Sequence, residues 1–176
     1  MRINAENTIA IMVDYQEKLI PAMKNGNEVI ESTRKLIEGL DVLGVPVYFT
    51  QQYTKGLGDT VPELKNIVEN TTYIEKIIFS AYSEIQNLIE GKQFVILGGV
   101  EAHICVLQTL IDLKTHGYTP VLVTDCIDSR KQLDYNIALE RAKQEGAVLT
   151  TYESILFELL QKAGTEVSKK IQKIIK

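Results

Sequence analysis

Short, nearly uninterrupted apolar runs alternate along the chain with longer stretches in which apolar residues recur every three or four positions. The short runs are rich in β-branched residues and predict strands. They cover residues 8–13, 45–50, 73–78, 93–98, 120–124 and 147–150. Strands this apolar are typical of a parallel sheet with helices on both faces. The pattern therefore predicts an α/β fold with a mostly parallel sheet of about six strands.

Several of the longer stretches predict helices that connect these strands. One apolar stripe runs from Val29 to Leu43 and ends at Gly44. The stretches 102–116 and 132–145 repeat the pattern, and each is followed by a glycine that suits a helix end. These helices are the crossovers that parallel strands require.

Two further segments extend this plan. Residues 51–62 contain two glycines and a proline, and they predict a long loop that shapes a pocket after the second strand. Residues 165–176 predict a short amphipathic helix that docks on the parent domain or on a partner subunit. We expect one domain over residues 1–176, because no second domain or internal repeat is visible.

The charge balance narrows the classes of partner. The 176 residues carry 19 Lys and Arg against 23 Asp and Glu, a formal net charge of -4. Such a chain is a poor candidate for binding nucleic acid or an anionic membrane. Two cysteines are too few for a disulfide framework, and neither a leader peptide nor a membrane span is recognisable. The sequence therefore predicts a cytoplasmic protein with no nucleic-acid or membrane partner.

Polar residues at the carboxyl ends of strands are the first candidates for chemistry, because ligands of open parallel sheets gather there. Asp14 directly follows the first strand and is either a catalytic carboxylate or a turn-forming residue. Lys76 lies inside the third apolar run, so its ammonium must be exposed or paired. It is either functional or the charged residue of an edge strand.

Cys105 lies in the first turn of the helix predicted after the fourth strand, and this helix begins shortly after Gly98 and Gly99. The partial positive charge at a helix N-terminus lowers the pKa of a thiol, and the free N–H groups there hold an oxyanion. Cys105 is therefore a candidate nucleophile, and packing in the core is the alternative.

The remaining histidine and cysteine residues are weaker candidates for a chemical role. His103 and Cys105 diverge by about 200° around a helix, so they do not share a proton. We interpret His103 as a pocket-lining or structural residue. With His116 as the only other histidine, a histidine-rich metal site lacks ligands. Cys126 follows the fifth strand, where it packs near the sheet edge or has a secondary redox role.

Asp14, Lys76 and Cys105, each in or just after a different predicted strand, match the pattern of the isochorismatase-like cysteine hydrolases. The surrounding segments resemble the isochorismatase domain-containing subgroup of that family. They are 13–23 (VDYQEKLIPAM), 50–64 (TQQYTKGLGDTVPEL), 76–80 (KIIFS), 98–109 (GGVEAHICVLQT) and 125–130 (DCIDSR). Five such segments in order, within about residues 8–160, make the resemblance specific.

The resemblance implies a three-layer α/β/α sandwich and an Asp-Lys-Cys triad. In that family Cys105 would attack a carbonyl carbon, Asp14 would be the base for the thiol and later for water, and Lys76 would stabilise the charged partners. A cis peptide bond between Val100 and Glu101 is also implied. The backbone N–H groups of Glu101 and Cys105 would then form the oxyanion hole.

The resemblance also bears on the substrate pocket and on metals. We expect the pocket to be lined by Gln16, Gln52, Tyr53, Phe79 and His103. Metal-dependent nicotinamidases of the family carry an Asp-x-His motif after the second strand, which this chain lacks, so no metal ion is expected. True isochorismatases lack the cysteine nucleophile, so cleavage of a vinyl ether is not expected either. Thr54 stands where the subgroup usually has proline.

These observations predict a cysteine hydrolase without metal or cofactor, acting on a small amide, carbamoyl or related C–N carbonyl substrate through a Cys105 thioester. The family likeness further implies a homo-oligomer, a dimer or higher. The rival hypothesis is a catalytically silent binding or scaffold protein with the same fold. A flavodoxin-like nucleotide binder is disfavoured, because no phosphate-binding glycine loop follows the first strand.

Overall fold

A computed structural model describes residues 1–69 and 71–176. Six parallel strands form one sheet in the order β3-β2-β1-β4-β5-β6. Their bounds are β1 Thr8–Val13, β2 Val47–Gln52, β3 Thr72–Lys76, β4 Phe94–Val100, β5 Thr119–Asp128 and β6 Val148–Thr150. The chain winds outward from β1 to one edge and then from β4 to the other. The direction of winding reverses between β1 and β4, and ligands of such sheets bind beyond the carboxyl ends of the strands at this place.

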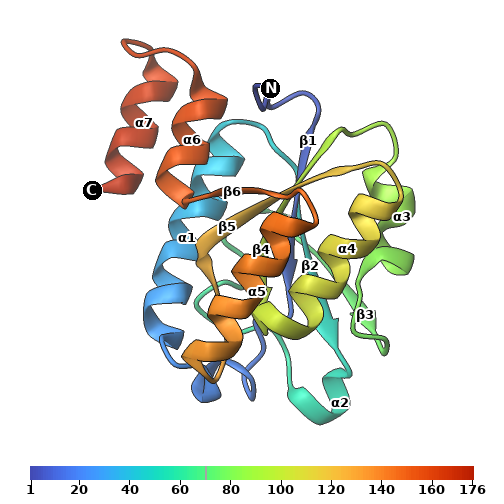
Figure 1. The fold of residues 1–176 in the computed structure, drawn as a ribbon. Coiled ribbons are helices and arrows are strands. Elements are labelled where there is room, and N and C mark those ends of the chain that lie inside the picture. The colour runs from blue at the N-terminus through green and yellow to red at the C-terminus, as the bar shows by residue number, and fades with distance from the viewer. Residues whose placement is uncertain (70) are drawn as a thin grey trace.

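Helices cover both faces of the sheet, as Figure 1 shows. The face nearer the C-terminus carries α1 (Gly26–Val42), α6 (Tyr152–Leu160) and α7 (Glu166–Ile175). The opposite face carries α3 (Tyr82–Ile89), α4 (Leu107–Thr115) and α5 (Gln132–Gln144). This arrangement confirms the three-layer α/β/α sandwich with a six-stranded sheet. Helix α7 packs on α1 and α6 of its own chain.

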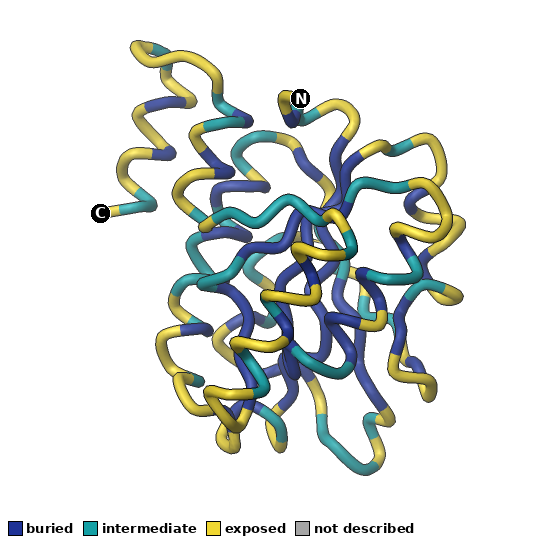
Figure 2. Tube along the Cα trace, in the orientation of Figure 1, coloured by how far each residue is buried: buried dark blue, intermediate teal, exposed yellow. Residues whose placement is uncertain are grey.

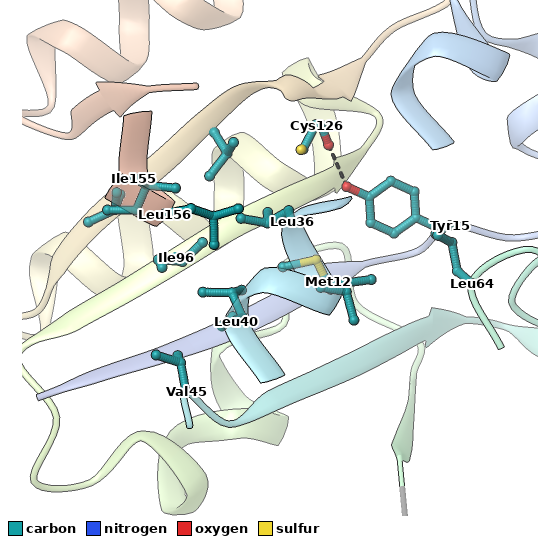
Figure 3. Close-up of a cluster of buried hydrophobic side chains, with 14 of the residues drawn as sticks. Met12, Tyr15, Leu36, Leu40, Val45, Leu64, Ile96, Cys126, Ile155 and Leu156 are labelled. Atoms are coloured by element: carbon teal, nitrogen blue, oxygen red, sulfur yellow. Dashed lines mark hydrogen bonds between the residues drawn. The ribbon is translucent and has the colours of Figure 1, made fainter. Parts of the chain in front are cut away.

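Alternate residues of each central strand enter two separate cores. On β1, Ala10 and Met12 belong to the core beneath α1, whereas Ile9, Ile11 and Val13 belong to the core beneath α4. Figure 2 shows the sheet and the inner helix surfaces as the most buried part of the chain, and Figure 3 shows the core beneath α1. A strand buried on both faces reads as a continuous apolar run, which explains why the strands are visible in the sequence.

Helices α3 and α6 were not predicted from the sequence. Each is short, so its apolar residues repeat over only about two turns and give a weak periodic signal. In α6 the buried residues are Ile155, Leu156 and Leu159, and the helix begins at an N-cap, Thr151, whose hydroxyl accepts the Ser154 N–H. The cap adds a local start signal that the apolar pattern alone does not carry.

Several predicted bounds were wrong by a few residues near the carboxyl ends of strands. The segment 51–62 is less of a loop than predicted, because β2 extends to Gln52 and a short helix, α2 (Thr54–Leu57), follows. Strand β3 ends at Lys76, earlier than predicted. The next residues, Ile77 and Ile78, lie outside the sheet and are exposed.

Strands β1 and β4 approach each other unusually closely at Gly99. This residue has φ +146, and a Cβ built on it would lie 2.4 Å from the Val13 carbonyl oxygen. Only glycine permits this backbone conformation and this separation. The close approach places the carboxyl end of β1 beside the connection that leaves β4, which is where the chemical candidates lie.

None of the helices in the described part of the chain has the length and apolar character needed to cross a membrane.

Candidate active site

Three candidate residues from separate parts of the chain meet at the carboxyl ends of the strands. Asp14 follows β1, Lys76 is the last residue of β3, and Cys105 lies in a short π-helix, η2 (Ala102–Val106), that follows β4. The exposed fractions of Asp14, Lys76 and Cys105 are 0%, 2% and 6%. Lys76 Nζ lies 2.7 Å from Asp14 Oδ2, and the charges of both groups act on the Cys105 thiol. The structure therefore brings the three residues into one buried cluster.

Asp14 shapes the turn after β1 and also presents its carboxylate to the cluster. Its backbone has φ 56, in the left-handed region, and its carbonyl accepts the Gln16 N–H at 2.8 Å. The Thr50 hydroxyl donates to Asp14 Oδ1 at 2.8 Å. Oδ2 forms the ion pair with Lys76 but accepts no well-aligned hydrogen bond from the described residues. Oδ2 therefore has the Lys76 ammonium as its charged partner and keeps lone-pair capacity for a second donor.

The Lys76 ammonium is surrounded by oxygen atoms. Besides Asp14 Oδ2, it donates to Gln52 Oε1 at 2.6 Å and to the backbone carbonyls of Phe79 at 2.9 Å and Ile78 at 3.3 Å. Four oxygens thus face the three protons of one ammonium group. β3 is an edge strand, as one interpretation of Lys76 requires. The side chain nevertheless turns inward, so it does not serve as the exposed charge of an edge.

The predicted lowering of the Cys105 pKa was wrong. Burial is the main cause that raises the pKa of this thiol to about 12, and the Asp14 charge raises it further. Lys76 acts in the opposite direction, with a smaller effect. Moving a thiolate out of water raises its free energy by more than the partial positive charge at the start of the short helix η2 lowers it. Cys105 therefore rests as a thiol, and a base must take its proton when it reacts.

The peptide bond between Val100 and Glu101 is cis, at the position that the resemblance implied. The Glu101 carboxylate is almost fully buried. It accepts the Arg130 backbone N–H at 3.2 Å, and the Arg130 Nε atom lies 3.0 Å from its Oε2 atom. This pair ties the connection after β4 to the segment after β5. Sequence reasoning missed it, because the partners are 29 residues apart and lie in two different sequence segments.

The five residues expected to line the pocket have different roles in the structure. Gln16 and Gln52 are buried, and both of their amides bond to protein atoms. Tyr53 and Phe79 are about half exposed, at 49% and 53%. Tyr53 directly follows Gln52, and Phe79 lies three residues after Lys76. His103 is partly buried, and its Nδ1 atom lies 2.9 Å from the Ser129 hydroxyl.

Two grooves lie near these residues. One, of about 570 Å³, borders Lys76 and is lined by Tyr53, Lys55, Glu75, Lys76, Ile77, Ile78 and Glu84. A larger groove of about 790 Å³ runs along the start of α1 and includes none of the three clustered residues. Within residues 1–69 and 71–176, no group of three or more His, Cys, Asp or Glu side chains is placed to hold a metal ion.

Comparison with known proteins identifies the family. Residues 8–154 match the family model described as the isochorismatase domain. The chain belongs to the isochorismatase family. It is 36% identical over 178 residues to the isochorismatase domain-containing protein 2A of Mus musculus, and the match covers 99% of this chain and 85% of that protein. The family and the subgroup inferred from five sequence segments are thereby confirmed.

Solved structures agree with this assignment to the isochorismatase family. The MAR1 ribonuclease of Caenorhabditis elegans is 38% identical, with a TM-score of 0.95, and the match covers 99% of this chain and 92% of that one. The Escherichia coli YcaC protein, described as an octameric hydrolase of unknown specificity, is 22% identical. Its TM-score is 0.87, and the match covers 92% of this chain and 83% of that one. The likeness to the YcaC protein shows the fold alone. Membership of the isochorismatase family supports a hydrolase.

Proposed function

We propose that this isochorismatase-family protein is a metal-independent cysteine hydrolase of a small amide, carbamoyl or related C–N carbonyl compound. The observation that carries the proposal is the convergence of Asp14, Lys76 and Cys105, with one Asp14 oxygen left without an aligned donor. A thiol, a base and a fixed positive charge are the groups that nucleophilic acyl transfer requires.

The first half of the proposed reaction forms a thioester. Asp14 Oδ2 takes the Cys105 thiol proton while Sγ attacks the carbonyl carbon, and the carbonyl electron pair moves to oxygen. The backbone N–H groups of Glu101 and Cys105 stabilise this oxyanion. When the tetrahedral intermediate collapses, the C–N bond breaks, and Asp14 returns its proton to the leaving nitrogen.

The second half releases the acid. A water molecule attacks the thioester carbon and gives one proton to Asp14, and the C–S bond then breaks. Asp14 passes this proton back to the Cys105 sulfur, so that the site returns to its starting state with a carboxylic acid and an amine as products. Throughout the cycle the Lys76 ammonium opposes the negative charge on Asp14 and on sulfur.

The raised pKa of the Cys105 thiol supports a mechanism that uses a base rather than a preformed thiolate. A thiol with a pKa of about 12 is almost wholly protonated at neutral pH. The charge of Asp14 acts on this thiol, and its Oδ2 atom has capacity for a donor besides Lys76. Proton removal during attack avoids forming a buried thiolate beforehand. The 6% exposure of Cys105 further supports a small substrate.

The assembly and location of the protein form part of the same proposal. We propose a homo-oligomer, a dimer or higher, because the YcaC protein of the same fold is described as octameric. Both cysteines are free and buried, which supports a reducing compartment such as the cytoplasm.

The test is a screen of the purified protein against amides, ureides, carbamates and an RNA oligonucleotide, with Cys105→Ala as the matched variant. RNA is included because one relative is named a ribonuclease. We expect release of an amine or ammonia from one of the small compounds, and a loss of at least about 1,000-fold in Cys105→Ala. Acid quenching should trap an acyl group on Cys105, detectable by mass spectrometry.

Two results would contradict the proposal. Cleavage of RNA without cleavage of any small carbonyl compound would replace the substrate class. Absence of turnover across the whole panel, together with loss of a binding partner in Cys105→Ser, would favour the rival hypothesis of a silent scaffold.

A further inference from the structure

We propose that Gln52 is a positioning residue that holds the Lys76 ammonium beside Cys105. The inference rests on the proposed function of the Asp14, Lys76 and Cys105 cluster. It replaces the expectation that the Gln52 amide faces the substrate.

Both ends of the Gln52 amide are used inside the protein. Its Oε1 atom accepts from Lys76 Nζ at 2.6 Å, and its Nε2 atom donates to the Ile77 carbonyl at 2.5 Å. The second bond decides which end faces the lysine, because a rotated amide would place an NH₂ group against the ammonium and leave the carbonyl without a donor. The amide is therefore oriented as an acceptor for Lys76.

The backbone of Gln52 is also held in place. Gln16 Oε1 accepts the Gln52 N–H at 2.7 Å, and Gln16 Nε2 donates to the Gln52 carbonyl at 3.0 Å. Gln16 itself is fully buried and lies two positions after Asp14. Gln16, in the turn after Asp14, thus fixes the backbone of Gln52. Gln52 in turn holds Lys76, which is the ion-pair partner of Asp14.

A neutral amide is suited to this position by its charge. A hydrogen bond from a charged donor to a neutral acceptor fixes the donor without cancelling its charge. The ammonium of Lys76 therefore has one carboxylate partner, Asp14, and its remaining field lowers the pKa of Cys105. A carboxylate at residue 52 would add negative charge near the sulfur and raise the pKa of the thiol.

The neighbouring residue Gln51 provides a matched control. It is 8% exposed, as is Gln52, and it lies on the same strand. Its Nε2 atom donates to the Thr60 hydroxyl at 3.2 Å, and it makes no hydrogen bond to Lys76. Replacing either glutamine by methionine removes a buried amide of similar size from β2, but only one of the two changes touches the lysine.

The experiment measures alkylation of Cys105 by iodoacetamide between about pH 7 and 10, resolved by peptide mass spectrometry. The variants are Gln52→Met and Gln51→Met, each alone and combined with Lys76→Met. We expect Gln52→Met to slow alkylation about tenfold at a given pH, which corresponds to about one unit in the thiol pKa. Gln51→Met should stay within about twofold of the original protein, because its contacts do not reach the cluster.

The double variants separate positioning from general support of the fold. If Gln52 acts through Lys76, Gln52→Met should have no further effect once Lys76 is methionine. An equal effect in both backgrounds, an equal effect of Gln51→Met, or no effect of Gln52→Met would each overturn the inference. If Gln52→Met does not fold, Gln52→Asn provides the second variant, and unchanged alkylation in the folded Asn protein would also overturn it.

Alkylation requires no substrate, so this test is independent of the substrate screen. A failed screen with a positive alkylation result would refute the proposed hydrolysis and leave the role of Gln52 standing. A successful screen with no change in alkylation would support the proposed hydrolysis and refute the role of Gln52. Where a substrate is found, we expect Gln52→Met to lower kcat more than it changes KM, because the residue does not touch the substrate.

Discussion

The two cysteines of this protein lie on opposite faces of the sheet and differ in their neighbours. Cys126 belongs to the core beneath α1, and Cys105 belongs to the core beneath α4. Both are free and buried, and burial is the main cause that raises the pKa of each thiol. Only Cys105 lies beside a buried ion pair, that of Asp14 and Lys76, whereas Cys126 has the carboxylate of Asp125 next to it. Burial makes both thiols inert at rest, so reactivity depends on the groups that surround the sulfur.

The polar groups around Cys126 form a complete hydrogen-bonded chain. The Tyr15 hydroxyl donates to the Cys126 carbonyl, as Figure 3 shows, and it accepts from the Thr33 hydroxyl at 2.9 Å. Burial raises the pKa of both the Tyr15 hydroxyl and the Cys126 thiol. A carboxylate is also present, because Asp125 Oδ1 lies 3.9 Å from the Cys126 sulfur, but this oxygen already accepts the Tyr152 N–H at 2.9 Å. A satisfied network of this kind stabilises the fold. Asp14, the residue before Tyr15, instead pairs with the Lys76 ammonium beside Cys105.

Among the variants that test the contrast between Cys105 and Cys126, Asp14→Asn should have the largest effect. Hydrolysis should fall by about 10²–10⁴-fold, because the base is lost. Alkylation of Cys105 should become faster at a fixed pH, because the Asp14 charge raises the pKa of that thiol. The two rates are measured on one preparation, with an amide substrate and with iodoacetamide.

A matched control for this variant is Asp125→Asn, because Asp125 raises the pKa of Cys126 in the same way. It should leave hydrolysis and the labelling of Cys105 unchanged. Slower alkylation in folded Asp14→Asn would contradict the electrostatic role assigned to Asp14.

A smaller but direct difference is expected in the pH dependence of labelling. Below its pKa of about 12, Cys105 should react about tenfold faster for each added pH unit, since the thiolate fraction rises in that proportion. No plateau should appear below about pH 10. Cys126 is 0% exposed and should stay unlabelled in the native protein.

Iodoacetamide labelling followed by peptide mass spectrometry distinguishes the two sites. A plateau for Cys105 near the ordinary thiol pKa of about 8.5 would show that burial and Asp14 do not control this group. Labelling of both cysteines at equal rates would show that the protein opens before it reacts.

The smallest expected effect is a change in stability, and it tests the hydrogen-bonded network around Cys126. Tyr15→Phe leaves the Thr33 hydroxyl and the Cys126 carbonyl without their partner, so the free energy of unfolding should fall by about 1–3 kcal/mol. Urea denaturation measures this change. Hydrolysis and Cys105 labelling should remain within about twofold of the original values. A loss of activity at unchanged stability would assign Tyr15 to the site rather than to the core.

Much of the fold was predictable from the sequence because its signals are local. Strands β1 and β4 lie within about two residues of their predicted bounds, since each is a continuous apolar run. Helix α1 ends before Gly44, as its apolar stripe indicated. Helices α3 and α6 were missed, because eight or nine residues carry too few repeats.

The candidate site was predictable to a lesser degree. Asp14 was recognisable because it follows a strand, Lys76 because it is a charge inside an apolar run, and Cys105 because it lies at the start of a helix. The resemblance to a known family grouped the three. The oxygen cage around Lys76 was not recognisable, since it depends on where the chain turns after β3. The pair of the buried Glu101 and the exposed Arg130 also has no local signal.

The sequence alone determined the six strands, several of the helices that connect them, the family and the three candidate residues, because apolar periodicity and short motifs are properties of neighbouring positions. Only the tertiary structure decided that the Gln52 amide accepts a hydrogen bond from Lys76. It also decided that the Cys105 pKa is raised rather than lowered. Both outcomes depend on distances between distant segments and on the exclusion of water, and the energy of a charge in a protein is set by these two quantities.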